Sequence, residues 1–341
     1  MQKLLSVVIP VYKVEKYINK CLDSLIVSDE QMRKLEVIIV NDGTPDNSAI
    51  MAKEYEKRYP DIFKVIDKEN GGHGSAWNKG VELASGKYLR FLDSDDWVTN
   101  LSEFVERLEK YDVDMVFTDL QIVNEQSDSL NRLFKASVAM NTNYIYSVDD
   151  YDWCKTDAVF GGYNVTNFHI CTYRTSLLKE HHPIFFEKMS YDDEILFILP
   201  LCTAKTFVYI DLVLYNYLLG REGQSMDPKV MIKHLDFKTK IRKHETVFYY
   251  QYRPKSDNVN RKLQCILNSR HFDTFRLMTG LPYKDAIGQM NEMYLWIKDN
   301  YKEFKGKSSF GIYKMSPSVF WLFYHYFQPL WEFFKMRVLQ K

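Results

Sequence analysis

The sequence predicts an α/β protein with a mixed, mainly parallel sheet, helices on both faces of the sheet, and a helical region at the C-terminus. Three observations support this fold class. Short apolar runs alternate with amphipathic stretches over roughly the first 120 residues. Polar residues directly follow several of the apolar runs, as at the ligand-binding edge of an open sheet. After about residue 227 the spacing of apolar residues is helical.

The expected strands and helices alternate in chain order over the first part of the sequence. Strands are expected at 4–9, 35–40, 63–67, 88–92 and 115–118. Helices are expected at 14–26, 48–59, 75–84 and 101–109. This order is typical of parallel strands joined by crossover helices, which cover both faces of the sheet.

The middle of the chain is less regular. Residues 121–157 are polar and weakly periodic, which predicts a long loop or lid. A strand, a helix and a strand follow between 168 and 217, and the helix opens at Tyr191 and runs through Leu201. We therefore expect a domain over 1–226 and a helical region over 227–341.

The composition excludes several classes of protein. The 341 residues include 45 Lys and Arg and 45 Asp and Glu, so no net charge favours nucleic acid as a partner. Five cysteines without a CxxC pair argue against a disulfide framework or a structural zinc site and suit a reducing cytoplasm. The first ten residues lack the apolar core of a signal peptide, and no run of about 18 apolar residues predicts a membrane span.

The most informative motif is the run 91–97, an apolar strand end followed by Asp93, Asp95 and Asp96. Crowded carboxylates repel one another unless a divalent cation lies among them, and Mg²⁺ or Mn²⁺ prefers carboxylate and phosphate oxygens. Asp93 and Asp95 are therefore candidate metal ligands. The structural alternative is a solvated turn or a helix N-cap.

Two further motifs follow strands. In the run 41–46, Asp42 could accept hydrogen bonds from a base or ribose, although the run alone predicts only a turn. The run 69–80 places four glycines in a loop that leads into a helix, where backbone N–H groups could receive an anion. Its spacing matches neither a P-loop nor a dinucleotide fingerprint.

Taken together, these motifs resemble family 2 glycosyltransferases of the GT-A fold. The resemblance is carried by Val7–Tyr12, Asn41–Asp46, Glu69–Gly72, Ala76–Gly80 and Leu92–Asp96. It is clear over 4–118 and looser to about 226. It implies a half for the nucleotide sugar at about 1–120 and an acceptor half at about 121–226.

The resemblance also implies roles for individual residues. It assigns the nucleoside pocket to Pro10, Tyr12 and Asp42, the metal and donor diphosphate to Asp93 and Asp95, and the sugar and phosphate side to Asn70 and Asn78. The cofactor it implies is Mn²⁺ or Mg²⁺. The family commonly has arginine where this chain has Trp77, and His73 is an additional group in the loop, with a surface histidine as the alternative.

A second acidic run, 190–195, resembles the pair of acids that opens a helix beside the acceptor in this family. Asp193 aligns with the catalytic base, and Asp192 and Glu194 would support the base or the acceptor. A base is needed because an attacking hydroxyl must lose its proton. The alternative is an acidic helix N-terminus that complements the helix dipole.

Two C-terminal features complete the expectations. The runs 210–217 and 220–225 resemble a later segment of this family, a strand and loop that closes over the donor. In this segment Arg221 would neutralise the departing diphosphate, with an ordinary surface arginine as the alternative. Residues 319–341 contain seven Phe or Trp residues and a basic end, which suits peripheral contact with a membrane interface. A helix packed on the catalytic domain or an oligomer contact would explain the same tail.

The expected function is inverting transfer of a sugar from a nucleotide diphosphate, with UDP as the expected nucleotide, to a hydroxyl of a glycan or lipid-linked acceptor. The resemblance implies bacterial capsule, exopolysaccharide or wall-glycan synthesis at the cytoplasmic face of the membrane. Two alternatives are a carbohydrate-binding or scaffold protein without catalysis and, more weakly, a nucleotidyltransferase. The latter would carry a basic, glycine-rich element where this chain has Pro10 and Tyr12.

Overall fold

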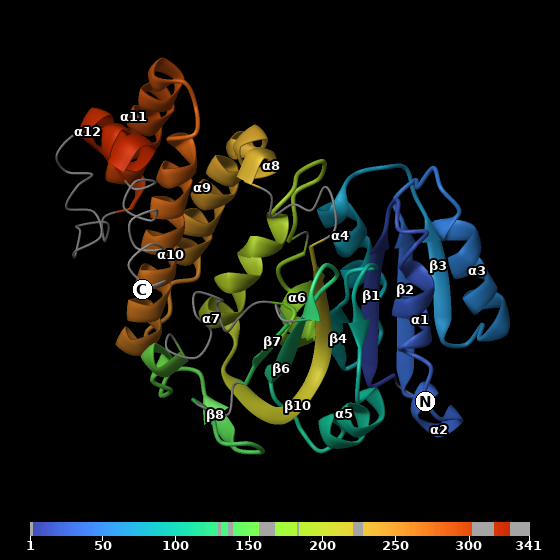
Figure 1. Ribbon diagram of the computed structural model, residues 1–341. Coiled ribbons are helices and arrows are strands. Elements are labelled where there is room, and N and C mark those ends of the chain that lie inside the picture. The colour runs from blue at the N-terminus through green and yellow to red at the C-terminus, as the bar shows by residue number, and fades with distance from the viewer. Residues whose placement is uncertain are drawn as a thin grey trace, which may run out of the picture. The chain divides into compact units, whose positions relative to one another are not determined.

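The computed structural model describes residues 3–128, 131–135, 139–156, 168–182, 184–220, 228–301 and 317–327. The chain divides into two compact units, and in Figure 1 most of the first is coloured from blue to yellow and most of the second from yellow-orange to red. The first contains Met1–Glu222 and Pro254–Asn260, and the second contains Gly223–Arg253 and Arg261–Lys341. The domain boundary expected after residue 226 falls in 221–227, outside the described residues.

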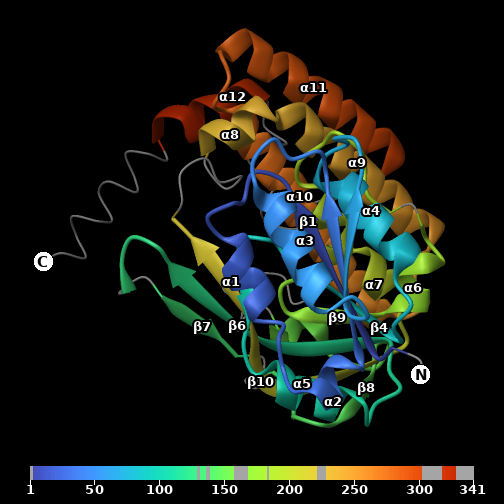
Figure 2. The same cartoon turned by 90° about the vertical axis from the view of Figure 1, so that its right-hand side faces the viewer.

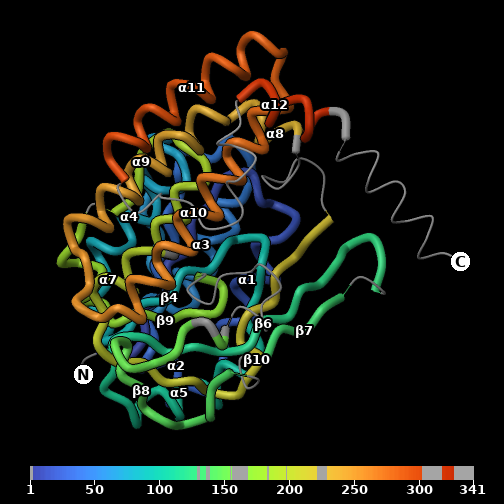
Figure 3. The backbone as a smooth tube through the Cα atoms, turned by 90° about the vertical axis from the view of Figure 1, so that its left-hand side faces the viewer, coloured from blue at the N-terminus to red at the C-terminus, as the bar shows by residue number. Residues whose placement is uncertain are grey.

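The first unit is built on a mixed sheet of ten strands among the described residues. The strands are β1 Leu5–Val11, β2 Leu35–Asn41, β3 Phe63–Asp67, β4 Tyr88–Phe91, β5 Trp97–Val98, β6 Met115–Asn124, β7 Arg132–Phe134, β8 Ile145–Ser147, β9 Cys171–Arg174 and β10 Thr206–Leu219. Their order is β3-β2-β1-β4-β9-β6-β10-β5, with β7 beside β6 and β8 beside β10. Figure 3 shows β6, β7 and β10 running beside one another.

The first four strands form the parallel part of the sheet. The chain moves from β1 to β2 to β3 in one direction and then returns across β1 to β4. Because such crossovers are right-handed, this reversal puts the helix after β2 on one face and the helix after β3 on the other. The point of reversal lies between β1 and β4, where open α/β sheets bind their ligands.

Helices cover both faces of this part of the sheet. The helices of the first unit are α1 Ile18–Asp23, α2 Asp29–Met32, α3 Ser48–Arg58, α4 His73–Leu83, α5 Leu101–Leu108, α6 Thr175–Lys179 and α7 Leu199–Thr203, with 3₁₀ helices η3 Trp153–Thr156 and η4 Asp192–Phe197. Figure 2 shows α1 and α3 in front of the parallel strands, and α4 packs on β1 and β2.

Two expectations about the elements were wrong. The stretch 121–157 is not one long loop, since β6 continues to Asn124 and β7, β8 and η3 also lie in it. Strands β7 and β8 are short and partly exposed, so their apolar periodicity is weak. The helix expected from Tyr191 to Leu201 is split into η4 and α7 around Ile198, and Pro200 stands in the first turn of α7, where proline is tolerated.

The second unit is helical throughout its described residues. Its helices are α8 Pro228–Lys233, α9 Leu235–Gln251, α10 Asp257–Met278, α11 Tyr283–Asn300 and α12 Pro317–Leu322, followed by the π-helical turn η6 Phe323–Phe327. Helix α11 packs against both α9 and α12. No helix in the described ranges combines the length and the apolar character needed to span a bilayer.

Candidate functional site

The carboxyl ends of β1, β2 and β4 meet at one edge of the sheet because the three strands are parallel and in register. Pro10 is buried in β1 opposite Val40, and Tyr12, just beyond β1, leaves 44% of its surface exposed. Asp42 follows β2 and Asp93 follows β4. The structure therefore gathers four of the residues expected at the nucleotide site at the switch point of the sheet.

Asp42 organises the loop between β3 and α4. Its buried carboxylate accepts hydrogen bonds from the backbone N–H groups of Gly71 and Gly72, both at 2.8 Å, and from Lys68 Nζ at 2.7 Å. Asn70 donates its amide to the backbone oxygen of Asp42 at 2.9 Å. Asp42 and Asn70 thus bind each other's segments, and their expected contacts with the nucleoside and the sugar remain predictions.

The glycines of this loop allow another segment of the chain to approach. Gly72 has a φ of 86°, a left-handed conformation that glycine adopts without strain. A Cβ on Gly74 would lie 1.9 Å from Asp192 Oδ2 and 2.5 Å from the backbone oxygen of Phe186. The N–H groups of Gly71 and Gly72 already bind Asp42, and the expected contact of an anion with the N-terminus of α4 remains a prediction.

Asn78 and Trp77 hold α4 against the segment that precedes η4. The amide of Asn78 donates to the Phe185 backbone oxygen at 2.8 Å and accepts from the N–H groups of Ile184 and Phe185 at 3.0 and 3.1 Å. The ring of Trp77 is fully buried and contacts Phe91, with ring centroids 4.2 Å apart. Asn78 thus joins α4 to residues 184–185, and its expected place on the sugar and phosphate side remains a prediction. Trp77 belongs to the core.

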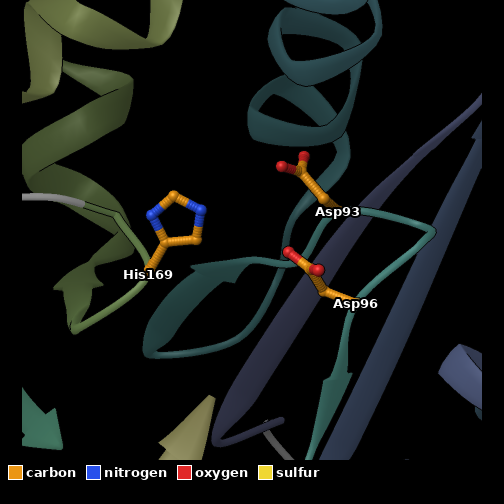
Figure 4. A group of neighbouring side chains, drawn as sticks. All are labelled: Asp93, Asp96 and His169. Atoms are coloured by element: carbon orange, nitrogen blue, oxygen red, sulfur yellow. The ribbon is translucent and has the colours of Figure 1, made fainter. Parts of the chain in front are cut away.

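Two of the three clustered aspartates and a histidine form a group with the spacing of a metal site. Ligand atoms of Asp93, Asp96 and His169 all lie within 4.8 Å of one another. Figure 4 shows the two carboxylates on the loop after β4 and the imidazole opposite them, on the segment before β9. Two carboxylates and an imidazole suit a divalent cation such as Mn²⁺. Asp95, expected as a ligand, is not one of the three, whereas Asp96 and His169 join Asp93.

Asp96 is held in place by two hydrogen bonds. Tyr215 Oη donates to Asp96 Oδ2 at 2.6 Å, and the Leu218 N–H donates to Asp96 Oδ1 at 2.8 Å. Tyr215 Oη also accepts a hydrogen bond from the Asp93 N–H at 3.1 Å. Burial, with the charges of Asp95 and Asp93, raises the pKa of Asp96 well above its usual range. A cation in this group would therefore also relieve the repulsion among the carboxylates.

His169 is positioned by a buried arginine. Arg90, on β4, donates one guanidinium nitrogen to the backbone oxygen of His169 and another to Thr172 Oγ1 at 2.8 Å. Burial lowers the pKa of His169 to about 4, so the ring is neutral near pH 7. A neutral imidazole is the form that binds a metal ion.

The second acidic run lies beside the glycine loop. Asp192 is buried, whereas Asp193 and Glu194 are partly exposed. Tyr191, directly before them, has a φ of 68°, a conformation that costs free energy for a residue with a bulky side chain. The strained turn directs the Asp192 carboxylate toward α4, where Asp192 Oδ1 lies 3.8 Å from His73 Nδ1.

His73 lies between the two acidic groups. Its Nε2 atom lies 3.2 Å from Asp93 Oδ1, and its Nδ1 atom faces Asp192. Burial alone would lower the pKa of His73, but the carboxylates of Asp192 and Asp93 outweigh it and raise the pKa well above its usual value. The loop histidine is thus part of the site, unlike an ordinary surface histidine.

The structure leaves some expected residues untested. Arg221 and residues 328–341 of the tail lie outside the described part of the chain. Sequence reasoning missed His169 because no motif surrounds it. It missed Tyr215, within the run 210–217, because nothing in that run shows that its hydroxyl meets the acidic loop after β4. Asp96 was noted only as a neighbour of Asp93 and Asp95, since adjacent aspartates cannot be ranked as ligands before the turn that carries them is known.

Comparisons with known proteins agree with this geometry. The family model for glycosyl transferase family 2 matches residues 6–171. An uncharacterized glycosyltransferase, EpsJ of Bacillus subtilis, is 41% identical over 118 residues, which is 34% of this chain and 33% of EpsJ. The minor teichoic acid biosynthesis protein GgaB of the same species is 42% identical over 94 residues, 28% of this chain and 10% of GgaB. The matched part of the chain thus spans a third or less of these relatives.

Solved structures support the fold. Staphylococcus aureus TarS 1–349, in complex with UDP-GlcNAc, superposes with a TM-score of 0.63 at 20% identity, over 88% of this chain and 89% of TarS 1–349. At this identity the likeness concerns the fold alone, and it confirms the predicted class of mixed sheet with helices. The family model for glycosyl transferase family 2 over residues 6–171, the motifs at the edge of the sheet and the likeness of the fold thus agree with one another.

Proposed function

We propose that this protein transfers a sugar from a nucleotide diphosphate to a hydroxyl group of an acceptor, with a divalent cation held by Asp93, Asp96 and His169. The observation that carries the proposal is this group of ligand atoms, which lies at the switch point of the sheet. The donor set fits Mn²⁺ or Mg²⁺. When bound, the cation would neutralise charge on the departing diphosphate.

The proposed reaction is a single displacement with inversion at the anomeric carbon. The acceptor oxygen forms a bond to the anomeric carbon while the bond between this carbon and the diphosphate oxygen breaks. The nucleoside diphosphate leaves with the electron pair of the broken bond. Asp193 is the proposed base that takes the hydroxyl proton, and Asp192 and Glu194 support it. The transition state resembles an oxocarbenium ion, so catalysis depends on stabilising the charge of the leaving group.

UDP is the proposed nucleotide of the donor. The titles of the TarS structures name UDP-GlcNAc and UDP as ligands of that protein, and the folds are alike. Pro10, Tyr12 and Asp42 form the proposed nucleoside pocket, in which the exposed ring of Tyr12 can stack on a base. The proposed aid to the departing diphosphate from Arg221 rests on the sequence resemblance.

The proposed acceptor is a growing glycan or a lipid-linked precursor in bacterial surface-polymer synthesis. One relative is named a minor teichoic acid biosynthesis protein and another a poly(ribitol-phosphate) beta-glucosyltransferase. Peripheral contact with a membrane through 319–341 would bring the enzyme to a lipid-linked acceptor at the cytoplasmic face. The exposed side chains of Val319, Leu322 and Phe323 are consistent with such contact.

The first test is a thermal-shift panel of UDP, GDP, CDP and dTDP, each with and without Mn²⁺, on the wild type and on Asp93→Asn. A ligand at 100 times its Kd stabilises the folded state by about 2.7 kcal/mol. We expect a Mn²⁺-dependent rise in melting temperature with UDP that is lost in Asp93→Asn.

Asp95→Asn is the matched control in this panel, because Asp95 lies two residues from Asp93 but outside the group of three ligand atoms. It should keep most of the shift. If Asp95→Asn loses the Mn²⁺-dependent rise in melting temperature and Asp93→Asn keeps it, the metal ligand is Asp95 and not Asp93. If no nucleotide shifts the wild type, the chain is instead a binding or scaffold protein on this fold.

A further inference from the structure

The side chain of His73 joins two acidic segments that are far apart in the sequence. Asp93 follows the strand β4, and Asp192 opens η4 roughly a hundred residues later. The two ring nitrogens of His73 face one carboxylate each, Nε2 at 3.2 Å from Asp93 and Nδ1 at 3.8 Å from Asp192. The imidazole thus lies between the two carboxylates, in contact with Asp93 and one short step further from Asp192.

Asp192 depends on this histidine. Its side chain is fully buried, and among the described residues no donor lies within hydrogen-bond distance of either of its carboxylate oxygens. A buried carboxylate without a cation nearby is costly, because the charge has lost its water. The ring nitrogen Nδ1 of His73 is a polar group that faces this carboxylate, at 3.8 Å. Gly74 allows the approach, because a Cβ at this position would lie 1.9 Å from Asp192 Oδ2.

The ring of His73 has little freedom to leave this position. It packs on Trp77, one turn further along α4, with ring centroids 4.2 Å apart. Trp77 in turn is fixed by the rings of Phe91, Phe168 and Phe185. The packing of these rings therefore restricts the rotation of the His73 imidazole.

We propose that His73 is a positioning residue that couples the donor site to the acceptor side by holding Asp93 with one ring nitrogen and Asp192 with the other. Through Nε2 it orients the carboxylate of a metal ligand. Through Nδ1 it fixes the first residue of η4, and so the place of Asp193. This inference rests on the proposed function, since it assigns His73 to the reaction described above.

Two substitutions separate the two contacts. The amide nitrogen of glutamine lies near the place of Nε2, so His73→Gln keeps the contact with Asp93 and loses the one with Asp192. The amide nitrogen of asparagine lies near the place of Nδ1, so His73→Asn does the reverse. The measurements are the Kd of UDP in the presence of Mn²⁺ and the rate of UDP release from UDP-GlcNAc with water as acceptor.

We expect the two variants to differ in kind. His73→Gln should bind UDP within about 2-fold of the wild type and release UDP from UDP-GlcNAc at least roughly 10-fold more slowly, because Asp192 is no longer held. His73→Asn should bind UDP with Mn²⁺ roughly 10-fold more weakly, because loss of a group that orients a metal ligand typically costs 10- to 100-fold in affinity.

A double-mutant cycle with Asp192→Asn tests the coupling through both turnover and melting temperature. His73→Gln combined with Asp192→Asn should be no worse than either single variant, because both remove the same contact. Additive losses would overturn the proposal, as would single variants that lower only the melting temperature. Equal losses of binding and turnover in both His73 variants would mean that His73 contacts the donor itself.

The melting-temperature cycle also separates this inference from the proposed function. It needs no ligand, so a wild type that binds no nucleotide would remove the proposed function but still report whether His73 and Asp192 are coupled. Coupling in melting temperature without any nucleotide binding would leave only a structural bridge and overturn the assignment to the reaction.

Discussion

The carboxylate of Asp42 accepts hydrogen bonds from two successive backbone N–H groups and an ammonium group, and thereby fixes the loop that carries His73 into α4. Single residues matter at this site because each one joins segments that the chain brings together only after folding. Tyr215 similarly contacts both Asp93 and Asp96 from β10. The consequences of losing such a residue should be local and measurable.

Asp42→Asn is expected to lower the free energy of unfolding by about 1–3 kcal/mol, because the new NH₂ group faces donors and leaves a buried N–H without an acceptor. Urea unfolding at pH 7 measures the change. Asp67→Asn is the matched control, since Asp67 ends the neighbouring strand β3 and pairs with Lys53 at 2.7 Å with 54% of its side chain exposed. An exposed pair contributes little, so the control should change by less than about 1 kcal/mol.

The segment before η4 contains sharp turns of the backbone. The segment from 185 to 192 passes close to the glycine loop, and two of its residues, Lys188 and Tyr191, adopt positive φ angles of 54° and 68°. From Tyr191 to Leu201 the sequence predicts one helix, because the acids and apolar residues have helical spacing. Tertiary packing against Gly72 and Gly74 decides the conformation instead, and a single sequence does not reveal that packing.

Lys188→Gly is expected to raise the free energy of unfolding by about 1 kcal/mol, because Lys188 is exposed and its left-handed conformation strains a residue with a Cβ. Thermal or urea unfolding measures the gain. Glu187→Gly is the matched control, since Glu187 is equally exposed but is not among the residues with positive φ. It should be destabilised through greater freedom of the unfolded chain, and a gain in the control would refute the strain argument.

Across the whole molecule, the parts that could be predicted are those in which local pattern and tertiary structure agree. The parallel strands β1 to β4 are short apolar runs with polar ends, so the fold class and Asp42 and Asp93 could be located from the sequence. His169 could not, because its role depends on β9 lying antiparallel between β4 and β6. Asp95 was favoured over Asp96 by motif spacing, although the turn after β4 buries Asp96 beside Tyr215.

The division into two units does not follow the chain in simple order. Ser256 and Asn258, which precede or open α10, bond to the backbone oxygens of Asp149 and Tyr151 in the first unit. A fragment that ends at residue 226 lacks these contacts. We expect trypsin to cut such a fragment after the exposed Lys155 several-fold faster than it cuts the full chain, because local opening controls cleavage.

The full chain with Ser256→Ala and Asn258→Ala is the control for this experiment. It should show part of the same acceleration at Lys155 and none at Lys64, which is exposed on β3 far from these contacts in the sequence. Equal cleavage of fragment and full chain would mean that residues 254–260 do not stabilise the first unit.

The late position of β9 in the sequence leaves an edge of the sheet uncovered in the nascent chain during translation. Strand β4 ends at Phe91, but its partner β9 ends only at Arg174, so 174 − 91 = 83 residues must leave the ribosome before this edge is covered. At about 5–20 residues per second this takes roughly 4–17 seconds. During that time the parallel strands present an open edge able to pair with other chains. Synthesis of this protein should therefore benefit from a chaperone that shields nascent β-strands.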